Sequence, residues 1–148
     1  MQIEAYTIAV LGAGTMGEGI AQIAGTAGHP VLLYDVSQVQ TQSAIENIDK
    51  RLQRTVHKEK ITDKKRTRIL TNIKPVQTLE ELAKAKLSIE AIIEDLLIKQ
   101  EVFSQLELLL EEDAILATNT SSIDLNEMAS VLKRRNALSA CTFLILLL

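Results

Sequence analysis

The sequence is poor in cysteine and in long apolar runs, and it has no Lys or Arg before Lys50. Its single cysteine, Cys141, cannot form a disulfide within the chain, so we expect a reducing, cytoplasmic compartment. Because no basic residue precedes the first apolar run, we expect no signal or transit peptide. The apolar tail TFLILLL is far shorter than the roughly 20 residues that cross a bilayer, so we expect no membrane partner.

The length and composition are those of one globular domain. The 148 residues are 47% hydrophobic, which is enough for a sizeable core. The chain shows no internal repeat, no low-complexity tract and no linker rich in Pro and Gly, so we expect no domain boundary within it. A formal charge of −3 and a pI near 5.4 argue against nucleic acid as a partner.

The positive charge is concentrated in one segment. Of the sixteen Lys and Arg residues, nine fall between Lys50 and Arg68. They are Lys50, Arg51, Arg54, Lys58, Lys60, Lys64, Lys65, Arg66 and Arg68. The cluster is either a binding surface for an anionic partner or a solvated helical face.

Short apolar runs alternate along the chain with segments whose apolar residues recur at helical spacing. Strands are predicted at residues 6–11, 31–34, 73–76, 87–93 and 114–118. Helices are predicted at residues 16–27, 38–58, 62–70, 79–85, 98–110 and 125–132. This alternation predicts an α/β fold with a doubly wound, mostly parallel sheet covered on both faces. Ligands of such sheets bind at the carboxyl ends of the strands.

The first predicted strand runs directly into GAGTMG, residues 12–17. In a dinucleotide-binding loop, Gly12 would make the tight turn, Gly14 would let a pyrophosphate approach, and Gly17 would let the helix pack closely. Thr15 and Met16 would then open a helix whose N–H groups face the phosphates. The alternative is a plain turn between a strand and a helix.

An acidic residue supports the dinucleotide interpretation. Asp35 ends the second predicted strand, eighteen residues after Gly17, where a carboxylate can bind the ribose hydroxyls. It would repel a 2′-phosphate, and no Lys or Arg follows it closely, so NAD is favoured over NADP. The alternative role of Asp35 is that of a helix cap.

A cluster of small polar residues follows the predicted strand at 114–118. The run Asn119-Thr120-Ser121-Ser122 stands at a carboxyl end, where a ligand of a parallel sheet binds. The alternative is an N-cap for the next helix, which Ser122 or Asp124 suits. The two roles are compatible, and the cluster is predicted to line the reacting end of a dinucleotide site.

Three segments together resemble the N-terminal domain of L-3-hydroxyacyl-CoA dehydrogenases, including 3-hydroxybutyryl-CoA dehydrogenases. They are IAVLGAGTMGEGIAQIAGTAGHPVLLYD, SIEAIIEDLLIKQEVFSQL and ILATNTSSI, within residues 7–134. The resemblance implies that residues 1–148 form a Rossmann-type NAD-binding domain with a helical hairpin after the second strand. It implies oxidation of a 3-hydroxyacyl-CoA to the 3-ketoacyl-CoA with NAD, or the reverse. A non-catalytic NAD-binding module and a dehydrogenase of the β-hydroxyacid type remain alternatives.

The resemblance also implies roles for single residues. Glu94 and Lys99 match a pair near the nicotinamide, although a helix start also favours an acid such as Glu94. Asn119 matches an amide beside the nicotinamide ribose. Ser121 matches a serine that hydrogen-bonds the catalytic histidine and the substrate oxygen. Lys58 lies near a lysine that binds coenzyme A, and the basic hairpin helps to hold that group.

One part of the family pattern is missing. About twenty residues after the serine, the family has a catalytic histidine in HFFNP and then a glutamate that orients it. Counted without gaps, Thr142 takes the histidine's place, and a threonine cannot act as a general base near neutral pH. His29 and His57 are assigned structural or solvent roles, and with one cysteine we expect no zinc site.

The helical C-terminal domain that closes the site and dimerises in the family is not found in these residues either. The tail after Arg135 departs from the family pattern, which leaves open a truncation, a shifted reading frame or a sequencing fault. We expect the isolated chain to bind NAD without useful turnover. We expect residues 143–148 to form an edge strand or to pair with a second copy.

Overall fold

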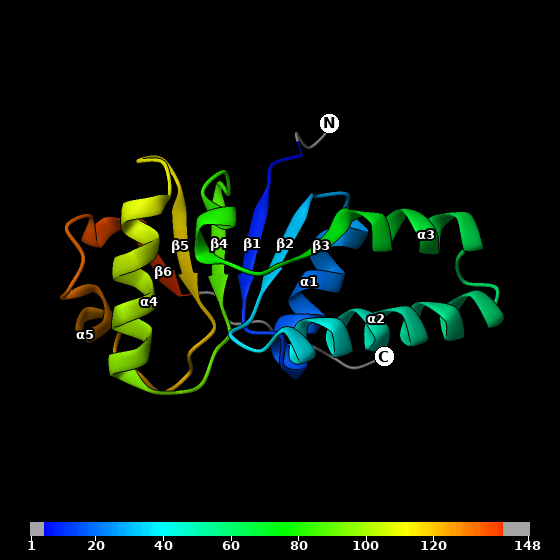
Figure 1. Cartoon of the computed structure of the whole chain (residues 1–148), viewed down its shortest axis with the longest axis horizontal. Helices are drawn as coiled ribbons and strands as arrows, with labels where there is room; N and C mark the ends of the chain where they lie inside the picture. The colour runs from blue at the N-terminus through cyan, green and yellow to red at the C-terminus, as the bar shows by residue number, and fades with distance from the viewer. Residues whose placement is uncertain (1–4, 141–148) are drawn as a thin grey trace.

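The computed structural model describes residues 5–140 and contains one parallel sheet (Figure 1). Its strands are β1 (Ile8–Leu11), β2 (Val31–Tyr34), β3 (Ile73–Val76), β4 (Leu87–Glu90), β5 (Ile115–Thr118) and β6 (Leu138–Ala140). They lie in the order β3-β2-β1-β4-β5-β6, and every neighbouring pair is parallel. This is the strand order of dinucleotide-binding sheets, so the predicted fold class is confirmed.

The connections between the strands are helical. The helices are α1 (Thr15–Ala27), α2 (Gln38–His57), α3 (Asp63–Asn72), α4 (Leu96–Leu109) and α5 (Leu125–Ala129), with short 3-10 turns η1 (Leu79–Leu82) and η2 (Arg135–Ala137). Side chains cap several of them: Ser37 accepts from the Gln40 N–H at the start of α2, and Thr62 accepts from the Lys65 N–H at the start of α3. Across residues 5–140, no helix combines the length and the apolar character needed to span a membrane.

Successive residues of β1 face opposite sides of the sheet and build two cores. Ile8 and Val10 pack with α1, α2 and α3, whereas Ala9 and Leu11 pack with η1, α4 and α5. Phe103 of α4 is fully buried in the second core, where truncating such a side chain to alanine typically costs about 3–5 kcal/mol. Because both faces are covered, a ligand can enter at the ends of the strands, and ligands of parallel sheets typically bind at the carboxyl ends.

The helices α2 and α3 form the hairpin expected after the second strand, and it projects beyond the sheet in Figure 1. Two arginines fasten it. Arg51 of α2 forms a salt bridge of 2.5 Å with the buried Glu18 of α1. Arg66 of α3 forms one of 2.6 Å with Asp49 of α2. These two cations of the basic cluster are therefore engaged in salt bridges between helices.

Several element boundaries differ from the prediction. The strand predicted at 87–93 ends at Glu90, because the Glu90 carboxylate accepts the Ile92 N–H at 2.7 Å and the chain turns out of the sheet. The last predicted helix ends at Ala129, and the helix predicted at 79–85 is the short turn η1. The pattern of residues did not predict β6, whose position depends on pairing with β5. Thr142 and the expected edge strand at 143–148 lie outside the described residues.

Candidate functional site

The loop between β1 and α1 has a geometry that requires glycine at two positions. Gly12 has φ +98°, and a Cβ there would lie 2.4 Å from the carbonyl oxygen of Ala91. A Cβ on Gly17 would lie 1.7 Å from the carbonyl oxygen of Gly12, so α1 can approach the loop only through a glycine. Gly14 is different, because no atom lies within 4 Å of its Cβ position. The protein leaves open the space that a side chain at Gly14 would occupy.

The open space faces the positive end of α1. Gly14 is the N-cap residue of this helix, and no side chain caps its first turn. The first N–H groups of a helix, together with its dipole, bind anions such as phosphate. Thr15 is exposed and Met16 half-buried at this end. The loop thus leaves the N-terminus of α1 uncapped and open, which is the geometry that the dinucleotide interpretation of residues 12–17 requires.

Asp35, just beyond β2, links the glycine loop that follows β1 to the loop that leads into α2. Its carboxylate accepts the Ala13 N–H and the Ser37 N–H, each at 2.8 Å. Ser37, not Asp35, is the residue that caps α2, so the alternative role of Asp35 as a helix cap is not the one observed. The negative charge is held beside the glycine loop, where the dinucleotide interpretation needs it.

A cavity of about 480 Å³ opens beside this loop. Gly12, Gly14 and Asp35 contribute to its wall. The rest of the lining is mostly apolar and comes from the ends of β1, β2 and β4 and from α2 and α4: Leu11, Tyr34, Val36, Gln40, Ala91, Ile92, Ile93, Ile98 and Val102. An apolar cavity with a few polar groups at its edge is the usual form of a small-molecule site.

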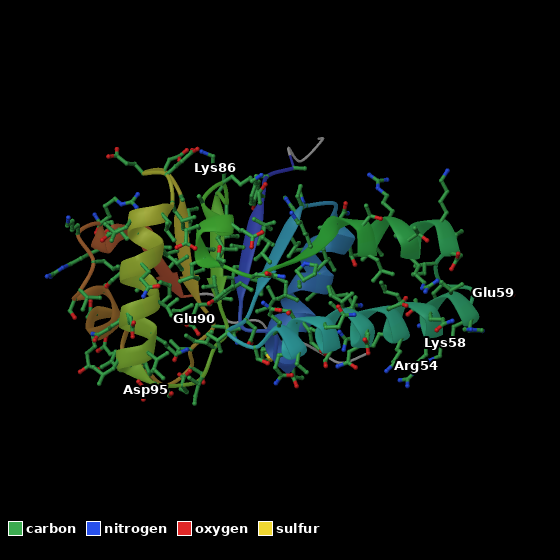
Figure 2. All side chains as sticks on the ribbon, viewed as in Figure 1. Arg54, Lys58, Glu59, Lys86, Glu90 and Asp95 are labelled. Atoms are coloured by element: carbon green, nitrogen blue, oxygen red, sulfur yellow. The ribbon has the colours of Figure 1, made fainter. Side chains whose placement is uncertain are left out.

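A buried ion cluster lies at the neighbouring strand ends. Lys99 of α4 is only 1% exposed, and its Nζ lies 2.7 Å from Oε1 of the fully buried Glu90 and 3.0 Å from Oε2 of Glu94. Figure 2 shows Glu90 at the end of the sheet, away from the tip of the hairpin. Lys99 is therefore enclosed, whereas the side chain of Glu94 is 42% exposed and carries the negative charge of the cluster at the surface.

The polar residues after β5 are attached to the same cluster. Thr118 donates its hydroxyl to Glu90 at 2.7 Å, and the Asn119 N–H donates to the Glu90 carbonyl at 2.8 Å. Thr120 and Ser122 donate their hydroxyls to the Glu94 carboxylate. Burial alone would raise the pKa of Glu94, but hydrogen bonds from Thr120, Lys99 and Ser122 outweigh it and lower the pKa to about 2.

The structure therefore brings Glu94, Lys99 and the polar run into one network. Asp124, one of the two cap candidates, accepts the Asn126 N–H at the start of α5, so Ser122 is left to bind Glu94. Ser121 is exposed beside them. The sequence reasoning missed Glu90, whose signal was a carboxylate inside the otherwise apolar run LSIEAII.

Other predicted residues lie elsewhere. Lys58 is exposed at the end of α2, at the outer tip of the hairpin in Figure 2. The 20 residues of α2 separate it from the glycine loop by about 30 Å of helix. His29 is buried against the ring of Tyr6, and His57 is exposed on α2. Within residues 5–140, no group of three or more His, Cys, Asp or Glu side chains is arranged to hold a metal ion.

Comparisons with known proteins agree with this geometry. Residues 7–144 match the family model described as "3-hydroxyacyl-CoA dehydrogenase, NAD binding domain", so the likeness continues beyond Arg134. The 3-hydroxyadipyl-CoA dehydrogenase of Escherichia coli K12 is 40% identical over 143 residues, which are 97% of this chain and 30% of the relative. A 3-hydroxybutyryl-CoA dehydrogenase of Clostridioides difficile is 41% identical over 86% of this chain and 45% of its own.

The fold of a solved relative is also similar. The crystal structure of an E. coli K12 3-hydroxybutyryl-CoA dehydrogenase superposes with a TM-score of 0.92 at 39% identity, covering 95% of this chain and 30% of that one. The chain thus spans between 30% and 45% of the length of these relatives.

Proposed function

Because the chain belongs to the 3-hydroxyacyl-CoA dehydrogenase family and is its NAD binding domain, we propose that it serves an enzyme that oxidises L-3-hydroxyacyl-CoA to 3-ketoacyl-CoA, or catalyses the reverse reduction. The observation that supports a role in NAD binding most directly is the contact between the glycine loop and Asp35. NAD, when bound, supplies the acceptor of the substrate hydride. The residues of this chain bind and orient it.

The first half of the site fits the adenosine and the phosphates of NAD. Gly14 leaves the backbone open beside the uncapped start of α1, which suits a pyrophosphate. Asp35 is held by the Ala13 and Ser37 N–H groups, with its charge beside a cavity whose apolar wall suits an adenine ring. In this assignment Gly12, Gly14, Thr15, Met16, Gly17 and Asp35 bind the cofactor.

The second half fits the nicotinamide end. Glu94 and Asn119 stand at neighbouring strand ends and bind the cofactor there. Lys99 is enclosed, so it acts as a positioning residue that fixes the Glu94 carboxylate. Ser121 is exposed beside this network, where it contacts the substrate oxygen and the catalytic base.

The complete enzyme requires more than these 148 residues. We assign the general base, the glutamate that orients it and a helical dimerisation domain to a further part of the protein, because the chain spans only 30–45% of its relatives. The complete protein is then a cytoplasmic homodimer acting on acyl-CoA in fatty acid metabolism. A relative named "Fatty acid oxidation complex subunit alpha" is 37% identical over 88% of this chain. Exposed hairpin cations such as Lys58 meet the coenzyme A phosphates.

The test is cofactor binding by the 148-residue chain, measured by NADH and NADPH fluorescence titrations. The wild type should bind NADH more tightly, and Asp35→Asn should narrow the gap, because it removes the charge that repels a 2′-phosphate. Asp113→Ala is the matched control, since Asp113 pairs with Lys86 before β4, at the opposite end of the sheet. Equal affinity of the wild type for both cofactors would contradict the assignment of Asp35.

A further inference from the structure

A second cavity, of about 430 Å³, lies at the opposite end of α1 from the glycine loop. Its lining comes from the end of α1 and from α3: Gly25, Thr26, Ala27, Gly28, Thr62, Lys64, Lys65, Arg68, Ile69 and Asn72. Gly28 comes shortly before β2 and Asn72 directly before β3, so this cavity is at the amino ends of the strands. The 13 residues of α1 hold the two cavities about 20 Å apart.

Three cations of the basic cluster line this cavity. Lys64, Lys65 and Arg68 are spaced so that they share one side of α3. Arg66 points to the other side, where it binds Asp49 and Asp63. Within residues 5–140, Lys64, Lys65 and Arg68 make no salt bridge. The nearby acid Asp63 is already engaged with Arg66, so three cations without a salt bridge line the same cavity.

The uncharged walls leave room for a ligand. Thr62 accepts the Lys65 N–H at 3.1 Å and still has a hydroxyl hydrogen to donate. Asn72 donates to the Gly25 carbonyl at 2.9 Å, which satisfies one carbonyl at the end of α1. Gly28 has no atom within 4 Å of its Cβ position, and the buried Ile69 forms an apolar wall.

We propose that this cavity binds a small phosphorylated ligand, with a diphosphate group placed between Lys64, Lys65 and Arg68. The volume falls in the range of about 300–1,000 Å³ that small-molecule sites occupy. Lysines bind phosphate as point charges, and arginine offers paired donors to it. The site shares no lining residue with the cavity beside the glycine loop, so the two ligands can bind at the same time. The cations of the hairpin thus serve two surfaces, one along α2 and one between α3 and α1.

The three cations could instead stabilise α1 without binding a ligand, and that role leads to a different experimental result. Positive charge near the carbonyl end of α1 stabilises that helix, and that effect requires no ligand. If it is the whole role, neutralising the three cations lowers the melting temperature and no phosphorylated compound binds.

The experiment is isothermal titration of the chain with pyrophosphate at low ionic strength, in saturating NADH so that the glycine loop is occupied. One variant is Lys64→Gln/Lys65→Gln/Arg68→Gln. The matched control is Lys74→Gln/Lys84→Gln/Lys133→Gln, which removes the same charge from exposed cations outside both the cavity and the hairpin. We expect saturable binding by the wild type and the control, and binding at least tenfold weaker in the α3 variant.

Three results would overturn the proposal: no saturable binding by the wild type, equal weakening in both variants, or citrate binding as tightly as pyrophosphate. The last two results would show that the surface binds anions by their charge alone, without selecting a phosphate group. Direct NADH titration of all three proteins reports whether they are folded. It also tests the NAD site independently, so a failure there is not confused with a failure here.

Discussion

Replacing Lys99 by methionine removes the cation that faces both Glu90 and Glu94. Glu90 would keep its hydrogen bonds from Ile92 and Thr118, at 2.7 Å each, but its fully buried charge would lose the opposite charge. Removing one partner of a buried ion pair typically costs about 3–5 kcal/mol. Domains of this kind are stable by about 5–15 kcal/mol, so Lys99→Met should cost a large share of the free energy of unfolding.

Two further variants make this reasoning specific. Glu90→Gln leaves Lys99 paired with Glu94 at 3.0 Å, so its cost should be smaller, about 1–3 kcal/mol. The double variant Glu90→Gln/Lys99→Met has no buried charge at either position, so it should be more stable than Lys99→Met alone. Urea unfolding followed by circular dichroism measures all four proteins at pH 7. A loss below about 1 kcal/mol for Lys99→Met, or strictly additive costs in the double variant, would refute the idea that the pair is coupled.

The remaining predictions concern the glycine loop and Glu94. Gly17→Ala should lower the melting temperature, because its Cβ would lie 1.7 Å from the Gly12 oxygen and overpacking typically costs about 1–3 kcal/mol. Gly14→Ala meets no protein atom, so it should leave the melting temperature unchanged while weakening NADH binding. A lower melting temperature with unchanged NADH binding would contradict the proposal that a ligand occupies the space beside Gly14. The folded pKa of Glu94 is lowered from 4.5 to about 2, so its stabilising effect is complete above pH 4.5 and is lost as the pH falls toward 2. The stability difference between the wild type and Glu94→Gln should therefore shrink over that interval, and a constant difference would contradict the assigned pKa.

Much of the fold could be predicted because its signals are local. Each signal lies within a few residues of the element that it specifies. Examples are the apolar run before GAGTMG, the helical spacing from Gln38 to His57 and the capping residue Thr62. The glycine spacing and Asp35 also predicted the position of the loop between β1 and α1, because the backbone at Gly12 has a positive φ that favours glycine.

The ion cluster could not be predicted in the same way. The partners of Glu90 are Lys99, nine positions away, and Thr118, 28 positions away. Their approach depends on where α4 and β5 pack, which no local pattern specifies. The strand β6 was missed for the same reason, since its three residues form a strand only through pairing with β5.

The position of Asp35 has a consequence for how cofactor preference can change in this protein. The Asp35 carboxylate, which we propose binds the ribose, also ties the glycine loop to the start of the hairpin, through the Ala13 and Ser37 N–H groups. Any substitution that admits a 2′-phosphate therefore also cuts a cross-link between two loops. A lineage or a designer that seeks NADP must first add stability elsewhere or replace both hydrogen bonds with another acceptor. A change of cofactor preference at Asp35 is therefore expected to lower the stability of the fold as well.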